Sequence, residues 1–306
     1  MDASAPASAP PAEPPPPAVP APAPGSTAPS ASTVAPAELP ELVAFEGVTK
    51  TFGEPPHAKV AIQDVSFVVR DLPNLGELIA LVGPSGCGKS TILRIIAGLG
   101  PHFPPTRGLA RVFGKPIGQP GADRGLVDQK YSLLPHLTVV ENIAFGLKLR
   151  GVPRKERQDR ARAWIAKVGL EGSEAKYPSE LSGGMQQRVA IAATLILGPR
   201  ILLMDEPFGA LDPRIRLRMQ ELLVQLWREQ QGTVFLVTHS VEEAVYLGDR
   251  VFIMAANPGR LVEVLEVPRP DDPPEHARRQ RWFTELTQEL LRRLERNEPA
   301  PADHQV

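Results

Sequence analysis

One segment of the chain, Gly83-Pro-Ser-Gly-Cys-Gly-Lys-Ser90, has the residue types and spacing of a loop that binds phosphate groups. It matches the pattern G-x-x-x-x-G-K-[ST] at every fixed position. The backbone can pass close to an anion at Gly83, Gly86 and Gly88, with amide N–H groups and a helix N-terminus pointing at it. We therefore predict that this loop holds the phosphates of a nucleotide.

The polar side chains in and after this loop supply charge and metal ligands. Lys89 places a positive charge at the terminal phosphates, and the Ser90 hydroxyl can bind Mg²⁺. Ser85 and Thr91 are also predicted to bind the nucleotide. We interpret Cys87 as a spacer whose backbone is used, rather than as a redox sensor.

Two adjacent carboxylates end a second apolar run, Arg200-Ile-Leu-Leu-Met-Asp-Glu-Pro207. At the end of a strand beside a phosphate-binding loop, Asp205 can hold Mg²⁺, usually through water. Glu206 then faces the γ-phosphate and can polarise an attacking water as a general base. The two acids predict hydrolysis of a nucleoside triphosphate.

The neighbouring segments have the patterns needed to position these residues. The continuous apolar run at 77–82 is typical of a strand in a parallel sheet that is covered on both faces. Residues 91–97 look helical, so the order is strand, glycine-rich loop, helix, which is the context this motif requires. Alternating patterns at 42–48 and 65–69 predict two further strands.

A second glycine-containing turn, Leu181-Ser-Gly-Gly-Met-Gln-Gln-Arg188, precedes the paired carboxylates. A helix N-terminus beginning at Ser182, Gly183 and Gly184 offers free amides to an anion. The segment matches the signature motif of ABC-type ATPases, and with the motifs above the chain resembles that family. In the family this motif binds the γ-phosphate held by the opposite subunit, so the resemblance implies that it acts in trans.

The resemblance also implies roles for residues elsewhere. Gln129 matches the Q-loop glutamine, which touches Mg²⁺ or the attacking water and senses the membrane partner. His239, directly after an apolar run, resembles the switch histidine that contacts the γ-phosphate. Gly209-Ala-Leu-Asp212 resembles the D-loop that crosses the dimer interface, and Phe52 matches the aromatic residue that stacks on adenine.

The resemblance covers about residues 41–265 and implies an α/β fold. Its expected parts are a RecA-like P-loop NTPase core, an antiparallel β region near the N-terminus and a helical signature subdomain over about 130–195. The charged run at 154–168, punctuated by apolar residues, predicts an exposed amphipathic helix there. Because the chain has one set of motifs, which cannot close its own site, we expect a second ATPase subunit, with a homodimer as the simplest form.

Both ends of the chain differ in composition from this central region. Residues 1–40 hold more than a third of the 35 prolines and no lysine or arginine, which predicts a disordered tail rather than a secretory signal. Over 266–306, Asp272 and Pro273 are expected to start a helix. Its apolar stripe is expected to pack against the core or the partner subunit, with a regulatory or membrane-surface role as the alternative. The stripe consists of Trp282, Leu286, Leu290 and Leu294, flanked by Phe283 and Leu291.

Composition limits the class of protein. The longest apolar stretch, 189–197, is about half of the ~20 residues needed to cross a bilayer. One cysteine excludes an internal disulfide framework, and the absence of a dense basic stripe argues against nucleic-acid binding. We expect a cytoplasmic protein that is held at the inner face of the cell membrane by a permease.

Segments 118–125 and 133–151 look most like the nitrate, sulfonate and taurine importer branch of the family, in which the ATPase is a separate polypeptide. That resemblance implies transmembrane permease subunits, an external solute-binding protein and a small anion as solute; an exporter or lipid-transport ATPase is the alternative. Two features depart from the branch: Asp128 stands where an aromatic residue is usual, and the turn at 100–108 is long.

Two other classes fit less well. An ABC protein that acts on DNA or ribosomes would need a coiled-coil insert or two sets of motifs, and the chain has neither. A non-hydrolysing regulator would lack one of Lys89, Glu206 or His239, and all three are present.

Overall fold

A computed structural model describes residues 39–72, 75–129, 132–209, 211–268 and 274–297. Nearly all of the predicted tail over residues 1–40 lies outside these ranges, as do Asp272 and Pro273. In the described part, no helix combines the length and the apolar character that a membrane crossing requires.

The central element is a six-stranded sheet in the order β10-β9-β3-β8-β7-β6. All neighbouring strands in it are parallel except β9 and β10, which pair antiparallel. Strands β3, β7 and β8 are buried along their whole length, as their continuous apolar sequences predict. The strands are β3 (Leu78–Val82), β6 (Arg124–Val127), β7 (Ile201–Asp205), β8 (Thr233–Val237), β9 (Arg250–Ala255) and β10 (Arg260–Glu266).

A second, antiparallel sheet of four strands has the order β2-β1-β4-β5. Its strands are β1 (Glu41–Phe52), β2 (Lys59–Arg70), β4 (Arg107–Val112) and β5 (Lys115–Pro116). The strands predicted at 42–48 and 65–69 lie within β1 and β2, which are longer than predicted because they pair with each other along almost their full length. The antiparallel β region is therefore confirmed.

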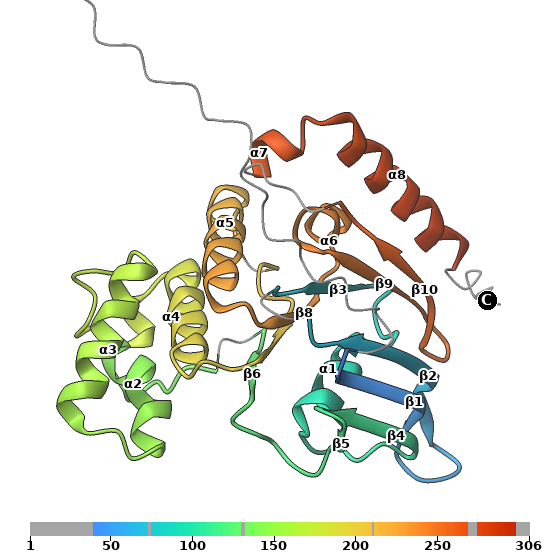
Figure 1. Ribbon diagram of the computed structural model, residues 1–306, viewed down its shortest axis with the longest axis horizontal. Helices are drawn as coiled ribbons and strands as arrows, with labels where there is room; N and C mark the ends of the chain where they lie inside the picture. The colour runs from blue at the N-terminus through green and yellow to red at the C-terminus, as the bar shows by residue number, and fades with distance from the viewer. Residues whose placement is uncertain (1–38, 73–74, 130–131, 210, 269–273, 298–306) are drawn as a thin grey trace, which may run out of the picture. The chain divides into compact units, whose positions relative to one another are not determined.

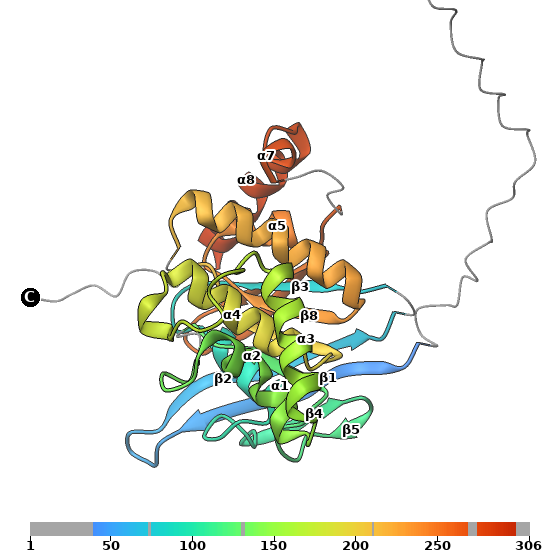
Figure 2. The same ribbon diagram turned by 90° about the vertical axis from the view of Figure 1, so that its left-hand side faces the viewer.

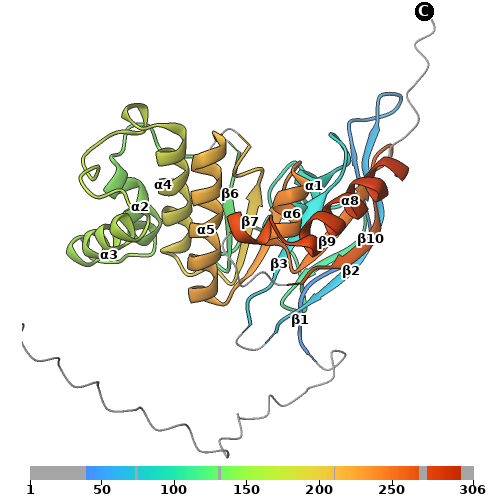
Figure 3. The same ribbon diagram turned by 90° about the horizontal axis from the view of Figure 1, so that it is seen from above.

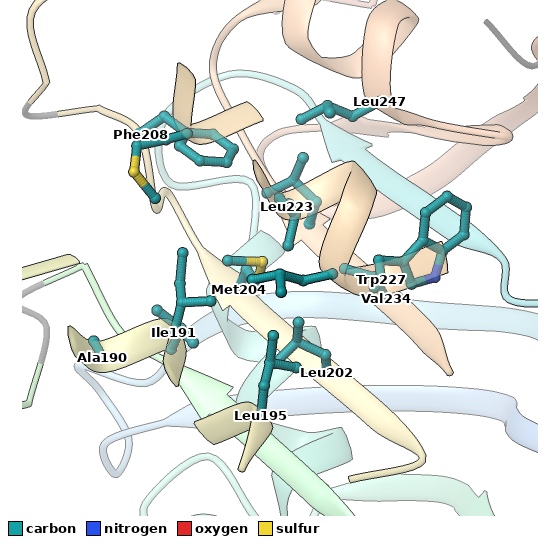
Figure 4. Close-up of a cluster of buried hydrophobic side chains, with 14 of the residues drawn as sticks. Ala190, Ile191, Leu195, Leu202, Met204, Phe208, Leu223, Trp227, Val234 and Leu247 are labelled. Carbon is teal, nitrogen blue, oxygen red and sulfur yellow. The ribbon is translucent and has the colours of Figure 1, made fainter. Parts of the chain in front are cut away.

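The faces of the large sheet are covered by different elements, as Figures 1 and 2 show. One face packs, through alternate residues such as Ile79 and Leu81, against α1 (Lys89–Ala97) and the antiparallel sheet. The other face packs against α5 (Pro213–Gln230) and α6 (Val241–Leu247). Figure 4 shows part of that second cluster, in which Leu202 and Met204 of β7 meet Leu223 of α5. Two covered faces explain why the central strands contain no polar alternation.

The remaining helices of the central region gather at the β6 side of the large sheet, away from β1 and β2 (Figures 1 and 3). They are α2 (Val139–Leu149), α3 (Arg154–Lys167), the short 3-10 helix η2 (Pro178–Glu180) and α4 (Gly183–Leu195). In α3 only Ala161 and Ile165 are buried, in agreement with the exposed amphipathic helix predicted there. The α/β core with a helical subdomain is therefore as expected.

The C-terminal segment forms two helices, α7 (Pro274–Ala277) and α8 (Arg281–Arg296), so the long helix does not start at Pro273. The backbone is extended at Gln280, which precedes α8 as its N-cap residue and separates the two helices. Phe283 and Leu290 are buried in the core cluster, whereas the side chain of Leu291 is exposed. Of the two expected packing partners, the stripe therefore contacts the core of its own chain.

Candidate nucleotide-binding and catalytic site

The predicted chemical residues follow strands whose carboxyl ends lie side by side. Strand β8 lies between β3 and β7 in the sheet. Val237 of β8 is the register partner of both Leu81 on β3 and Asp205 on β7, so the three strands end level with one another. Because parallel strands place their carboxyl ends on one edge, segments far apart in sequence meet there.

The loop after β3 is shaped by glycine. Gly88, the N-cap residue of α1, has φ 92°, and a Cβ added there would lie 2.2 Å from Cγ2 of Ile62 on β2. Any larger residue would therefore push the loop away from the antiparallel sheet. Lys89 is buried, and its Nζ donates to the carbonyl oxygens of Gly83 (2.7 Å) and Pro84 (3.0 Å). The lysine charge is thereby held inside the curve of the loop.

Ser90 and Asp205 bring two oxygen ligands together. The Ser90 hydroxyl donates to Asp205 Oδ1 at 2.8 Å. Burial raises the pKa of the Asp205 carboxyl, an effect opposed by the Ser90 hydrogen bond and by the charge of Arg94. A hydroxyl and a carboxylate are ligands that Mg²⁺ accepts, and the ion usually takes its other ligands from water and substrate phosphates. The described residues contain no cluster of three or more His, Cys, Asp or Glu able to hold a metal alone.

The predicted catalytic side chains converge on Glu206. His239 Nε2 lies 2.5 Å from Glu206 Oε1, and the Gln129 amide donates to Glu206 Oε2 at 3.1 Å. Glu206 itself has φ 49°, and its N–H donates to the Val237 carbonyl at 3.0 Å. A left-handed conformation of this kind costs a non-glycine residue about 1–2 kcal/mol, so the surrounding contacts must stabilise it.

Glu206 and His239 line a pocket of about 380 Å³, a size suited to a small-molecule ligand, whereas Gln129 is not part of its lining. It is open on one side and combines the phosphate loop with the residues that follow β7 and β8. Most of the predicted nucleotide-binding residues line it. The lining consists of Phe52, Lys59, Ala61, Ser85, Gly86, Gly88, Lys89, Ser90, Thr91, Glu206 and His239.

Comparison with known proteins agrees with this geometry. The family model for ABC transporters matches residues 63–209. An uncharacterized ABC transporter ATP-binding protein of Methanocaldococcus jannaschii is 49% identical over 222 residues, which is 72% of this chain and 80% of the relative. The chain belongs to the ABC transporter ATP-binding family. Its activity is ATP hydrolysis, as in other ABC ATPases.

Two further relatives and one solved structure show the range of the match. The nitrate import ATP-binding protein of a Synechocystis species is 50% identical over 197 residues (64% of this chain, 73% of the relative). The aliphatic sulfonates import ATP-binding protein of Bacillus cereus is 39% identical over 256 residues (83% and 96%). The solved structure of a dimeric ATP-binding cassette in a post-hydrolysis state, bound to ADP and Pi, matches with a TM-score of 0.64 at 31% identity. The match covers 74% of this chain and 99% of the cassette.

The signature motif of this ABC ATPase does not line the pocket formed by its own described residues. Ser182 is exposed and caps α4, its hydroxyl accepting from the Met185 N–H at 3.4 Å. Gly184 is buried, and a Cβ there would lie 2.7 Å from Cγ2 of Ile215 on α5. The structure thus adds a packing reason for this glycine that sequence reasoning missed. Within one chain, the signature motif therefore lies outside the pocket that the phosphate loop lines.

Phe52, the predicted adenine-stacking residue, stands at the end of β1 and is supported by groups that sequence reasoning missed. The His102 ring packs edge-to-face against it at 5.1 Å between centroids. Lys50 Nζ lies 5.3 Å from the Phe52 centroid and donates to the Pro104 carbonyl at 2.8 Å. The long turn at 100–108 therefore packs, through His102 and Pro104, behind the Phe52 side of the pocket.

Asp128, the departure from the importer branch, takes part in a polar cluster. Its carboxylate lies 3.6 Å from Arg94 Nη2, and the same nitrogen lies 3.8 Å from Asp205 Oδ2. Arg94 is a further residue that sequence reasoning missed, and its place on the helix after the phosphate loop was the available signal. Where an aromatic side chain is usual, this chain has an ion pair beside the expected metal ligand.

Proposed function

We propose that this chain is the ATP-hydrolysing subunit of an ABC importer for nitrate, taurine, a sulfonate or a related small anion. The observation that carries the catalytic part is the convergence of His239 and Gln129 on Glu206 at the edge of the pocket. The solute class follows from relatives named for nitrate, taurine and aliphatic sulfonate import. These relatives favour import over the exporter and lipid-transport alternative.

In this mechanism the protein's own groups act on the γ-phosphate of bound ATP. Glu206 accepts a proton from the attacking water, which Gln129 helps to orient. Lys89 and His239 stabilise the charge that develops on the transferred phosphoryl group. Mg²⁺ held by Ser90, Asp205 and Gln129 would neutralise charge on the β- and γ-phosphates. Phe52 would stack on the adenine ring.

The active form in this proposal is a homodimer. The exposed turn formed by Ser182 and Gly183 at the N-terminus of α4 offers amides to an anion but lies outside the pocket of its own chain. In a second copy the same turn would close the pocket over the γ-phosphate. The solved cassette that this chain resembles is itself dimeric.

The membrane partners in this proposal are permease subunits, which would keep the ATPase at the inner face of the cell membrane, with an external solute-binding protein on the other side. No role in nucleic-acid binding is included. A groove of about 380 Å³ on the helical subdomain supports permease docking, because it combines the apolar Phe145 with charged side chains such as Glu141, Lys148 and Arg157. Closure of the dimer would pull on a permease segment seated there, and hydrolysis would release it.

Substitution of the general base tests the catalytic assignment. Glu206→Gln keeps the side-chain volume but removes the base, so turnover is expected to fall by about 10²–10⁴-fold. ATP binding, measured with a fluorescent analogue, should survive because the phosphate loop is intact. The matched control is Glu171→Gln, at an exposed position, which should leave turnover unchanged. Near-normal ATPase activity of the Glu206 variant would contradict the assignment.

Reconstitution tests the solute and the direction of transport. The full chain would be assembled with its permease and solute-binding protein in proteoliposomes loaded with ATP. ATP-dependent uptake of nitrate, taurine or an alkanesulfonate is the expected result. Stimulation of ATPase activity by a lipid or by an exported compound, with no response to these anions, would reject the importer proposal.

A further inference from the structure

Behind the proposed site, a buried carboxylate has no part in the mechanism described so far. Glu243 belongs to α6, near the start of that helix, and is 5% exposed. Thr238, directly after β8, and Gln220 of α5 donate hydrogen bonds to its carboxylate, and Arg278 places a positive charge nearby. Because buried carboxylates are costly unless they are well paired, the arrangement of these partners indicates what this one does.

The first set of contacts fixes the turn that carries His239. The Thr238 hydroxyl donates to Glu243 Oε2 at 2.5 Å and accepts from the Ser240 N–H at 3.0 Å. The Ser240 hydroxyl in turn accepts from the Glu243 N–H at 3.2 Å. The residues on both sides of His239 are therefore bound, directly or through one hydroxyl, to Glu243.

The second set of contacts leads to α5 and the segment before it. Gln220 is fully buried, and its amide donates to Glu243 Oε1 at 3.2 Å. Arg216 Nε lies 3.7 Å from the same oxygen, while Arg216 Nη2 donates to the Leu211 carbonyl at 3.0 Å. Leu211 belongs to the predicted D-loop. One carboxylate thus connects the His239 turn with the D-loop segment of the same subunit.

The cluster is held together by charge as well as by hydrogen bonds. Burial raises the pKa of the Glu243 carboxyl, while the Thr238 hydrogen bond and the charges of Arg216 and Arg278 oppose that rise. Arg278 comes from the link between α7 and α8 and also lies 3.6 Å from Glu242. A buried polar cluster of this kind generally adds little net stability compared with apolar packing, but its directional contacts fix the relative positions of the groups that it joins.

We propose that Glu243 is a positioning residue for ATP hydrolysis, which holds the His239 turn beside Glu206 through Thr238 and links it to the D-loop through Arg216. The inference rests on the proposed function, in which His239 acts on the γ-phosphate. It predicts that breaking the cluster slows the chemical step without weakening ATP binding, because no member of the cluster lines the pocket.

Two variants of Thr238 isolate the link, measured in the full chain assembled with its permease. Thr238→Val keeps the shape but removes the hydroxyl, and is expected to lower kcat by about tenfold with KM for ATP unchanged. Thr238→Ser keeps the donor and should restore turnover. The melting temperature of each variant checks that the fold is intact.

Substitutions at Glu243 and at its neighbour Glu242 distinguish the effect of the buried charge from that of any negative charge on α6. Glu243→Gln keeps the volume but removes the charge that faces Arg216, and should lower kcat severalfold with the same KM. The matched control is Glu242→Gln, on the same helix but with an exposed side chain, which should behave as wild type. Equal effects of the two substitutions would overturn the inference.

A parallel His239→Ala variant distinguishes failure of this inference from failure of the proposed function. If His239→Ala keeps wild-type turnover, the proposed catalytic site is wrong. If it abolishes turnover while Thr238→Val and Glu243→Gln keep the wild-type kcat, only the positioning role is overturned. A loss of kcat accompanied by weaker ATP binding and a lower melting temperature would also overturn it, because it would show a purely structural role.

Discussion

Glu206 occupies its place through a backbone conformation that few non-glycine residues adopt. Its φ of 49° falls directly after β7, and contacts with Gln129 and His239 surround its carboxylate. Strain of this kind persists where the surrounding structure determines the conformation, and it is frequent at functional sites. The acidic residue is predictable from the motif, but its backbone conformation is not, because the motif contains no glycine or asparagine at that point.

Asp205 should lower the stability of the protein at neutral pH, in the absence of a bound metal ion. Burial raises its pKa, so the folded protein binds this proton more tightly than the unfolded chain does. The resulting stabilisation is complete below the ordinary value of 3.8 and is lost as pH rises through the raised pKa. Asp205→Asn, which removes the charge, is therefore expected to raise the melting temperature of nucleotide-free protein by a few degrees at pH 7.

The same variant should lose Mg²⁺-dependent ATPase activity, since one of the proposed oxygen ligands of the metal is weakened. Thermal melts of both proteins between pH 3.5 and pH 7.5 provide the measurement. The difference in melting temperature should shrink towards the acid end of that range. A variant that is less stable than wild type at neutral pH would show that the charge is well compensated in the fold.

Helix α8 illustrates how far an apolar stripe can be interpreted before the fold is known. Its spacing correctly indicated one buried face, and Phe283 and Leu290 are the residues that are fully buried. Arg293 pairs with Glu263 of β10, which adds a polar contact at the edge of that face. The place where the helix begins was predicted wrongly, because Pro273 and Asp272 suit a helix start whichever helix follows.

Two adjacent leucines test the packing of α8. Leu290 is 1% exposed and Leu291 is 44% exposed, so the same substitution should have different costs. Leu290→Ala is expected to lower the free energy of unfolding by about 2–5 kcal/mol through lost burial and a cavity. Leu291→Ala should change it little. Urea titrations measure both values, and amide hydrogen exchange of α8 shows whether the helix detaches by itself; equal costs would contradict the packing described here.

At the level of the molecule, a single chain carries every motif but does not bring all of them together. The phosphate loop, Glu206 and His239 share one pocket, whereas Ser182 and Gly183 lie outside it and are exposed. In the homodimer that we propose, each chain of a symmetric pair would complete the site of the other.

Complementation between two inactive variants tests the shared site. Lys89→Ala disables the phosphate loop, and Ser182→Glu places a negative charge where the γ-phosphate would bind. Neither homodimer should hydrolyse ATP, but a mixed dimer contains one site with both parts intact. Mixing the two purified variants is therefore expected to give turnover above that of either alone. No recovery on mixing, with mixed dimers shown by mass spectrometry, would contradict a site built in trans.

Features that depend on consecutive residues were predictable from the chain. The glycines around Lys89, the apolar strand before them and the acid pair at Asp205 each satisfy a local requirement of backbone shape or burial. For that reason the nucleotide-binding motif could be recognised without a structure, and the α/β class and the helical signature subdomain were implied by the resemblance to ABC-type ATPases. The steric reason for Gly88 could not, because the atom that excludes a side chain belongs to Ile62 on another sheet.

Contacts between distant segments depend on the order of strands, which no single segment specifies. Placing β8 between β3 and β7 brings His239 to Glu206 and Asp205 to Ser90. The burial of Glu243 has the same origin, since α5 and α6 must first cover one face of the sheet. Local patterns specify local conformation because their energetic requirements are met within a few residues. In contrast, which residues come together in the site is decided by packing. The favourable free energy of packing arises only when surfaces that are remote in sequence meet.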